Sequence, residues 1–167
     1  MEIKIDGNIN DIAEHLEFLE KECYKYPFCK VLELGVRTGN STRALIKGVN
    51  AVNGSLKSVD IDNCRDACSD PKWVFQQCDD IDLKLKPNEI YDIIFIDSSH
   101  KYAHTIAELN KFSGHLQQEG EFLMHDTMDG EVASAIKKFM ELNSGWKFTN
   151  REFCNGLGTL KRIGVEW

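Results

Sequence analysis

Long apolar runs, dense basic segments and internal repeats are all missing from this sequence of 167 residues. No apolar stretch approaches the roughly 20 residues that a membrane-spanning helix needs, so we expect no membrane partner. Lysines and arginines never stand more than two in a row, and the formal net charge is −7. Because binding to a nucleic-acid backbone depends on clustered positive charge, the sequence argues against nucleic acid as a partner.

An apolar leader segment is also missing, since the chain begins Met1-Glu2-Ile3-Lys4. Without such a segment, the six cysteines are better explained as reduced thiols in the cytoplasm than as disulfides. Cys64 and Cys68 are four positions apart, but the second pair of ligands that a structural zinc site needs does not follow. We therefore expect a cytoplasmic protein in which structural zinc is not favoured.

What the sequence does contain is a regular alternation of strand and helix patterns. Apolar residues at helical spacing predict a helix that ends near Pro27, with Asn10 or a neighbour as its N-cap. Strand and helix then alternate five times, and the helix before the fifth strand is expected to run to Glu119-Gly120. The predicted strands are 31–35, 56–61, 73–78, 91–96, 121–124, 146–153 and 157–163.

This order of elements predicts an α/β fold in one domain over residues 1–167. The seven strands are expected to form a mostly parallel, doubly wound sheet with helices on both faces. Asn155-Gly156 is a strong hairpin signal, so the last two strands should form an antiparallel C-terminal hairpin. We expect residues 1–29 to form an N-terminal helix and lead-in, 30–127 the core, and 128–167 a helix and the closing hairpin.

The stretch from Val31 to Ser41 joins a buried strand directly to a helix. Gly35 and Gly39 stand in the turn between them. Such a turn brings the backbone close to a ligand at a helix N-terminus. The Gly-x-x-x-Gly spacing differs from the Gly-x-Gly-x-x-Gly of dinucleotide sites, which argues against a nicotinamide oxidoreductase. Glu33, inside the strand, is costly to bury unless another group pairs with it.

Acidic or histidine residues follow each of the next four strands. They are Asp60 and Asp62, then Asp79 and Asp80, then Asp97 and His100, then His125 and Asp126. Any one acid in such a place is most often a helix cap or turn residue. Since the carboxyl ends of parallel strands line the crevice where ligands bind, the whole series predicts a site at that edge. His104 and His115 are interpreted as surface or packing residues.

Several ordered blocks resemble known enzymes. Val31–Ser41, Ser58–Asp60 and Tyr91–Asp97 are similar to the class I S-adenosylmethionine-dependent methyltransferases. Ile96–Tyr102 and Leu116–Thr127 resemble the metal-dependent O-methyltransferases, nearest the branch with small-molecule and sugar methyltransferases and cephalosporin-hydroxylase-like proteins, and more distantly catechol O-methyltransferase. The resemblance covers about residues 30–127. It implies a Rossmann-like fold in which that segment is the cofactor and metal core.

The resemblance implies S-adenosylmethionine as the cofactor. Gly35 and Gly39 would admit its methionine end, Glu33 would face its ammonium group, and Ser41 would bind its carboxylate at the positive end of a helix. The alternative for Ser41 is a plain helix cap.

The ribose and adenine are assigned to the next strand ends in the same way. Asp60 would hold both ribose hydroxyls, because a carboxylate has two acceptor oxygens, and Asp79 would accept the adenine amine. The full set implied for the cofactor is Glu33, Gly35, Thr38, Gly39, Ser41, Asp60, Asp79 and Asp97.

Asp97, His125 and Asp126 correspond to the metal ligands of the resembling family. Related proteins mostly carry an acid where this chain has His125. Oxygen ligands suit magnesium, whereas an imidazole shifts the preference towards manganese, iron or zinc. We expect a divalent metal, magnesium or manganese, and His125 as either a direct ligand or a group that supports the ligands.

His100 stands where related enzymes place the group that takes the proton from the substrate hydroxyl. A neutral imidazole accepts a proton near neutral pH. The resemblance therefore implies metal-assisted O-methylation of a hydroxylated small molecule or saccharide, with His100 and Asp97 as the catalytic pair.

Two alternatives besides the nicotinamide oxidoreductase need separate consideration. A nucleic-acid amine methyltransferase would show Asn/Asp-Pro-Pro-aromatic where this chain has Asp97–His100. A non-catalytic descendant would bind S-adenosylmethionine or metal as a sensor or assembly partner. Because few residues precede the predicted core, the acceptor pocket should be shallow, completed by a second subunit in a homodimer, or adapted to a large acceptor such as a saccharide.

Overall fold

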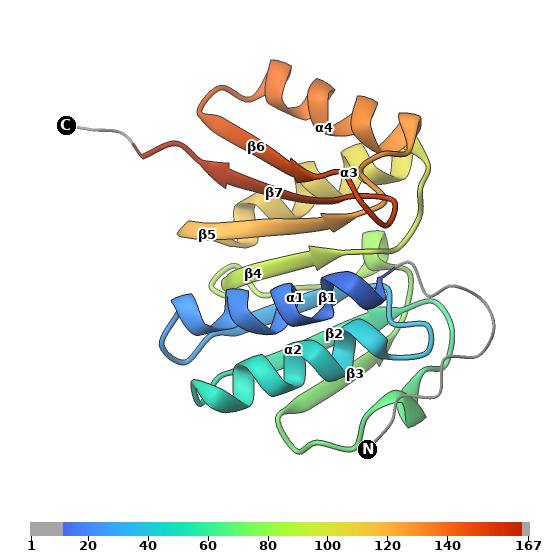
Figure 1. Ribbon diagram of the computed structural model, residues 1–167, viewed down its shortest axis with the longest axis vertical. Helices are drawn as coiled ribbons and strands as arrows, with labels where there is room; N and C mark the ends of the chain where they lie inside the picture. The colour runs from blue at the N-terminus through green and yellow to red at the C-terminus, as the bar shows by residue number, and fades with distance from the viewer. Residues whose placement is uncertain (1–11, 165–167) are drawn as a thin grey trace.

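The computed structural model describes residues 12–164, and seven strands from this part of the chain form one sheet (Figure 1). The strands are β1 Lys30–Leu34, β2 Ser55–Asp60, β3 Trp73–Gln77, β4 Tyr91–Ile96, β5 Leu116–His125, β6 Trp146–Arg151 and β7 Leu157–Arg162. They lie in the order β3-β2-β1-β4-β5-β7-β6. The first five are parallel, and β7 is antiparallel to both β5 and β6. The mostly parallel sheet with its antiparallel C-terminal hairpin is thus confirmed.

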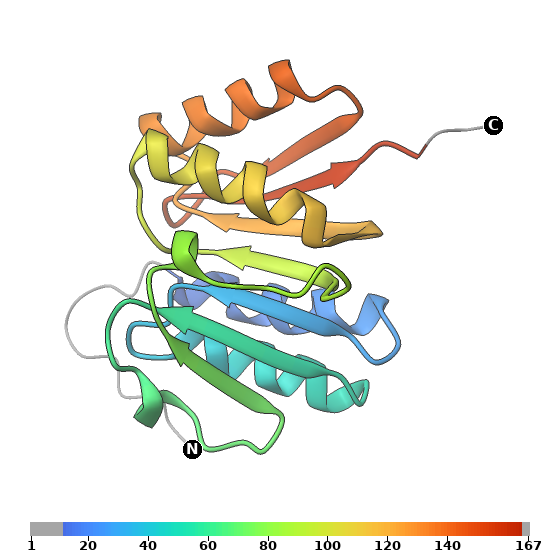
Figure 2. The same ribbon diagram turned by 180° about the vertical axis from the view of Figure 1, so that it is seen from behind.

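Two helices cover each face of this sheet (Figures 1 and 2). α1 (Leu16–Glu22) and α2 (Asn40–Ala51) lie together on one face, and α3 (Tyr102–Phe112) and α4 (Gly130–Leu142) lie on the other. The prediction of helices on both faces is therefore confirmed. The expected cap at Asn10 falls outside the described residues.

The connections on either side of β3 differ from the predicted alternation. They contain only the short 3₁₀ turns η3 (Arg65–Ala67) and η4 (Asp80–Asp82). Neither segment has the apolar residues at helical spacing that would bury one face of a longer helix. The prediction of five regular strand–helix alternations was wrong at these two places.

Alternate residues of each central strand point into two separate hydrophobic cores. In β4, Ile93 and Phe95 face α1 and α2, whereas Ile94 and Ile96 face α3 and α4. All four side chains are at most 4% exposed. The near-continuous apolar sequence of β4 follows from this burial on both faces.

β5 begins earlier than the sequence suggested. α3 ends at Phe112, the turn η5 (Ser113–His115) follows, and Leu116 pairs with Tyr91 across a register irregularity. Gly120 lies inside the strand, where a β-carbon would stand 2.6 Å from the carbonyl oxygen of Asp92. Leu116 therefore belongs to the strand and not to the inner face of the preceding helix.

The carboxyl ends of the five parallel strands meet at one edge of the sheet. Because β7 runs antiparallel to β5, the hairpin loop 152–156 between β6 and β7 returns to that same edge. Among residues 12–164, every helix is too short or too polar to cross a lipid bilayer.

Candidate functional site

A cleft of about 600 Å³ opens at this edge of the sheet. Its lining comes from the loop after β1, the loop after β4 and the start of α4. The lining residues are Arg37, Asp97, Ser98, Ser99, His100, Lys101, Asp129 and Glu131. Both charge signs are present, so the cleft suits a polar ligand.

Four side chains from the ends of β4 and β5 form one cluster beside this cleft. Nδ1 of His125 lies 3.1 Å from Oδ2 of Asp126 and 3.4 Å from Oδ1 of Asp97. Nε2 of His100 lies 2.7 Å from the same Asp126 oxygen. The sequence predicted that these four residues would share a site, and their side chains do lie together.

His125 is held as a cation. Its Nδ1 faces two carboxylates, and its Nε2 lies 3.2 Å from the carbonyl oxygen of Cys154. Since all of these partners only accept hydrogen bonds, both ring nitrogens must carry a proton. Burial lowers the pKa of His125, but hydrogen bonds to Asp126 and Asp97 outweigh it and raise the pKa to about 10.

The two carboxylates respond to this environment differently. For Asp97, burial is the largest effect and raises its pKa despite the hydrogen bond from His125. For Asp126, burial also raises the pKa, but the hydrogen bond and charge of His125 outweigh it, so the pKa lies below its usual value. Asp126 has a φ of +55°, a left-handed conformation that is uncommon outside glycine and that aims its side chain at both histidines.

A third histidine, His15, supports this cluster from behind. Its ring is fully buried, stacks on Phe153 at a centroid distance of 4.6 Å, and lies edge-on to His125 at 5.7 Å. Its Nε2 lies 3.1 Å from the carbonyl oxygen of Phe153. No pattern in the sequence connects His15 with the site, because the hydrogen bond between His15 and Phe153 spans 138 positions along the chain.

The geometry that suits a metal ion differs in one residue from the predicted ligand set. Ligand atoms of Asp97, His100 and Asp126 all lie within 4.8 Å of one another. In the described arrangement, His125 faces acceptors with both nitrogens, so neither presents a lone pair. The set Asp97, His125 and Asp126 stays a prediction, and Asp97 and Asp126 are the members that it shares with this group.

The loop after β1 is shaped by its two glycines. Gly35 has a φ of +94° and Gly39 a φ of +78°. A β-carbon on Gly39 would stand 2.7 Å from the β-carbon of Ala67. Thr38 is exposed in this loop and accepts a hydrogen bond from the Asn40 side chain at 3.3 Å. The glycines therefore allow the loop to turn sharply and to pack against its neighbours.

Glu33 finds the partners that a buried strand acid requires. Its carboxylate accepts hydrogen bonds from Ser41 at 2.6 Å, Thr42 at 2.8 Å and Ser58 at 2.5 Å. The Trp73 indole in turn donates to Ser58 at 2.8 Å. Burial raises the pKa of Glu33 to about 7, although the three hydroxyls act in the opposite direction. The Ser41 hydroxyl is thus bound to Glu33, and the network ties β1, β2, β3 and α2 together.

Asp60 connects the end of β2 to the loop after β1. Its Oδ2 accepts the backbone N–H groups of Val36 at 2.7 Å and Arg37 at 3.0 Å, and its Oδ1 accepts that of Asp62 at 2.9 Å. Burial raises its pKa, but these hydrogen bonds outweigh burial and lower the pKa below the usual value. Asp60 is therefore an ionised carboxylate in a fixed position.

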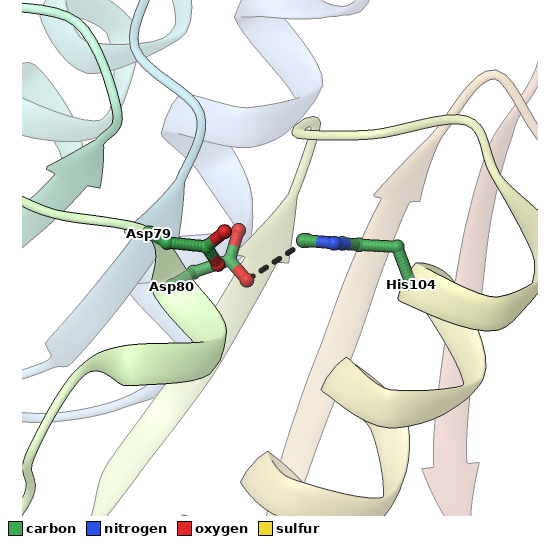
Figure 3. Close-up of side chains that lie close together, drawn as sticks. All are labelled: Asp79, Asp80 and His104. Carbon is green, nitrogen blue, oxygen red and sulfur yellow. Dashed lines mark hydrogen bonds and ion pairs between the residues drawn. The ribbon is translucent and has the colours of Figure 1, made fainter.

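A second cluster lies at the end of β3 (Figure 3). Asp79 caps η4 by accepting the backbone N–H of Ile81 at 2.9 Å. The next residue, Asp80, is only 9% exposed at its side chain and lies 2.9 Å from Nε2 of His104 on α3. The interpretation of His104 as a surface or packing residue missed this contact. Asp80 belongs to another element and lies 24 positions away, so no local pattern in the sequence signals this contact.

Comparison with known proteins identifies the family to which this chain belongs. A family model described as a methyltransferase domain matches residues 32–127. That segment runs from β1 through the cluster at the end of β5. Among curated proteins, no sequence matches this chain.

Solved structures with the same fold include three methyltransferases bound to ligands. An O-methyltransferase from Bacillus cereus in complex with SAH has a TM-score of 0.72, with 16% identity over 89% of this chain and 80% of that chain. The O-methyltransferase TomG from Streptomyces achromogenes is involved in tomaymycin synthesis and is in complex with SAM. It has a TM-score of 0.70, with 13% identity over 91% of this chain and 81% of that chain. MycE, from the mycinamycin biosynthetic pathway and in complex with Mg and SAH, has a TM-score of 0.69, with 16% identity over 97% of this chain and 54% of that chain. At these identities the likeness is one of fold.

Proposed function

The chain belongs to the family of methyltransferase domains, and from that premise we propose that it transfers a methyl group from S-adenosylmethionine to a hydroxyl oxygen, with the help of a divalent cation. The proposed acceptor is a hydroxylated small molecule or a saccharide. The observation that carries the proposal is the cluster of Asp97, His100, His125 and Asp126 beside an open cleft.

The residues around the loop after β1 fit S-adenosylmethionine. Asp60 is ionised and accepts three backbone N–H groups and the Cys64 thiol, and we propose that a ribose hydroxyl takes the position of the thiol, which is a weak donor. We assign the adenine amine to Asp79, and the methionine end to the turn from Gly35 to Ser41. Because the Glu33 carboxylate already accepts three hydroxyl groups, we propose that it acts on the cofactor by fixing Ser41 and Thr42 at the start of α2. SAM or SAH is bound to the fold relatives from Bacillus cereus and Streptomyces achromogenes.

The donor set beside the cleft fits a divalent cation. Asp97 and Asp126 supply carboxylate oxygens, which are the ligands that magnesium and manganese prefer. The fold relative MycE is in complex with Mg. When bound, such a cation would lower the pKa of the acceptor hydroxyl and hold its oxygen in place.

His100 is the residue that we propose takes the proton from the acceptor hydroxyl. Its side chain is 46% exposed and lines the cleft, and its Nε2 lies 2.7 Å from Asp126. A hydrogen bond from Nε2–H to Asp126 fixes the tautomer and leaves Nδ1 as the basic nitrogen. Asp126 thus orients the imidazole, as carboxylates do in other His–Asp pairs. Much of the rate would come from this positioning.

The acceptor side of the cleft is open. Arg37, His100, Lys101 and Glu131 are exposed around it, so a large or polar acceptor can approach without the movement of a lid. A second subunit could complete this side, and a homodimer stays a prediction that light scattering would test.

The test is methyl transfer from S-adenosylmethionine to a panel of catechols, phenols and saccharides, followed by release of S-adenosylhomocysteine. His100→Ala and Asp97→Asn should each lower turnover at least about 100-fold, in the range typical of a lost acid–base group. His115→Gln is the matched control, because His115 lies before β5 at the opposite edge of the sheet and contacts the carbonyl of Glu89. Full turnover in both site variants would remove the catalytic assignment.

A further inference from the structure

A second group of metal-ligating side chains lies outside the proposed methyl-transfer cluster. It is formed by Asp79 and Asp80, where η4 begins, and His104 on α3. Their ligand atoms all lie within 4.8 Å of one another, and Figure 3 shows the imidazole pointing at the two carboxylates. Acidic clusters of this kind are common without an ion, so the distances alone decide nothing.

The second observation is a buried carboxylate next to this cluster. Glu108 on α3 is 0% exposed, and its Oε2 has no hydrogen-bond partner among the described residues. Its Oε1 accepts the Ser98 hydroxyl at 2.5 Å and lies 3.8 Å from Nε2 of His104. Burial and then the charge of Asp80 raise the pKa of Glu108 well above its usual value, and a hydrogen bond between the two carboxyl groups acts in the same direction. Two buried carboxyl groups this close need either a shared proton or a cation between them, and a divalent ion beside Asp80 would take the place of the proton.

The positive charge that this cluster needs is not supplied by nearby side chains. Lys111 is close, but its ammonium group donates to the backbone carbonyls of Asp80 and Ile81, at 2.7 Å each. Within residues 12–164, no lysine or arginine forms an ion pair with Asp79, Asp80 or Glu108. Three carboxyl groups therefore face one imidazole.

We propose that Asp79, Asp80, His104 and Glu108 bind a divalent transition-metal ion at a site separate from Asp97 and Asp126. The 2.9 Å between His104 Nε2 and Asp80 Oδ1 suits this role, because two adjacent ligands about 2.1 Å from one ion stand about 3 Å apart. A donor set that combines an imidazole with carboxylates favours manganese, iron or zinc over magnesium and calcium.

The ion would add a link between two elements that His104 and Lys111 already join by hydrogen bonds. η4 is a single short turn, and α3 lies beside it. Cross-linking them would fix the segment after β3, in which Asp79 would bind the ion with one carboxylate oxygen and keep an acceptor position on the other, which caps η4, for the proposed adenine amine. The inference does not depend on methyl transfer, because it rests only on the donor set and its burial.

The experiment is a Mn²⁺ titration of the full chain, with free Mn²⁺ measured by electron paramagnetic resonance and Zn²⁺ added as a competitor. We expect a site that Zn²⁺ occupies, whose affinity falls at least about tenfold in His104→Gln and in Glu108→Gln, and that Asp126→Asn leaves intact. His115→Gln is the control and should bind like the unmodified chain. Mg²⁺ at the same concentration should compete poorly.

Three results would overturn the proposal. One is unchanged Mn²⁺ binding in both folded variants, and another is a single site that Asp126→Asn alone abolishes. The third is no Mn²⁺ or Zn²⁺ binding at all, which would indicate that Asp80 and Glu108 share a proton instead. If Glu108→Gln does not fold by circular dichroism, His104→Gln decides alone, since His104 is partly exposed on a helix surface. If the chain binds Mn²⁺ at the site of His104 and Glu108 but transfers no methyl group, the result would count only against the proposed function.

Discussion

A β-carbon on Gly35 would stand 2.1 Å from the carbonyl oxygen of Asp97. The ends of β1 and β4 thus approach each other more closely than any residue with a side chain allows. A hydrogen bond from Asp97 N–H to the carbonyl oxygen of Leu34 at 2.8 Å holds the approach, and one from Gly35 N–H to the carbonyl oxygen of Val59 at 2.9 Å ties the same turn to β2. The glycine that begins the proposed cofactor loop therefore also sets the position of the acid in the proposed cation site.

The first prediction is that Gly35→Ala destabilises the fold and weakens S-adenosylmethionine binding. The φ of +94° and the backbone contact with Asp97 together should lower the free energy of unfolding by about 3 kcal/mol. Urea unfolding followed by circular dichroism measures this change. Gly130→Ala is the control, because Gly130 has no atom within 4 Å of a β-carbon and should change stability by less than about 1 kcal/mol. Equal stability of the two variants would contradict the argument.

The second prediction concerns Glu33 and pH. The pKa of Glu33 is about 7 in the folded chain and 4.5 in a model peptide. Between these values the folded state binds more protons than the unfolded state, so this residue's contribution to stability is present below pH 4.5 and is lost as the pH rises towards 7. Between pH 4.5 and 8 this loss lowers the free energy of unfolding by about 3 kcal/mol, and Glu33→Gln should abolish it.

The measurement is urea unfolding of the unmodified chain and of Glu33→Gln at several pH values. The quantity to compare is the difference between their free energies of unfolding. Glu108 and Glu121 also have raised pKa values, but their effects occur in both proteins and cancel in the difference. Glu141→Gln, on the exposed side of α4, is the control for the same substitution away from the Glu33 hydrogen bonds. A pH-independent difference for Glu33→Gln would mean that Glu33 keeps an ordinary pKa.

Sequence patterns within a few residues predicted most helices and strands. The assignments that were wrong depend on contacts between residues far apart in the chain. The apolar strand Tyr91–Ile96 and the Asn155-Gly156 turn are both signals within a few residues, and both elements form as predicted. Leu116 was assigned to the wrong element, because its pairing with Tyr91 depends on a strand 25 positions away.

The site shows the same division. The sequence brought Asp97, His100, His125 and Asp126 together, because each stands at the carboxyl end of a strand and the order of strands makes those ends meet. It could not predict that His125 turns one nitrogen to the Cys154 carbonyl, since that contact depends on where the hairpin loop packs. Roles in binding the cofactor and the metal stay predictions for every assigned residue.

The third prediction is that Asp60→Ala lowers the affinity for S-adenosylmethionine at least about tenfold, since a carboxylate that accepts hydrogen bonds from ligand hydroxyls contributes more than 1 kcal/mol. The change also frees the backbone N–H groups of Val36 and Arg37, which Asp60 accepts at 2.7 and 3.0 Å. Isothermal titration calorimetry measures the affinity. Asp62→Ala is the control, because the Asp62 side chain is exposed and only its backbone N–H contacts Asp60. Equal affinities in the two variants would remove Asp60 from the cofactor site.

The last prediction separates the cation at Asp97 and Asp126 from the cofactor. Removing divalent metal with a chelator should lower methyl transfer at least about tenfold, because the acceptor oxygen loses the group that lowers its pKa. The fold should persist, since the His125 imidazolium still lies between the two carboxylates, 3.4 and 3.1 Å from them, and balances their charge. Binding of S-adenosylmethionine should therefore survive chelation, with an affinity within about threefold of the original, because Asp60 ends another strand and belongs to neither group of proposed metal ligands. Turnover and calorimetry in matched buffers, with Mg²⁺ and Mn²⁺ added back separately, test both halves. Turnover that persists in chelator would show that the imidazolium alone suffices beside the two carboxylates, and the cation would be dropped from the mechanism.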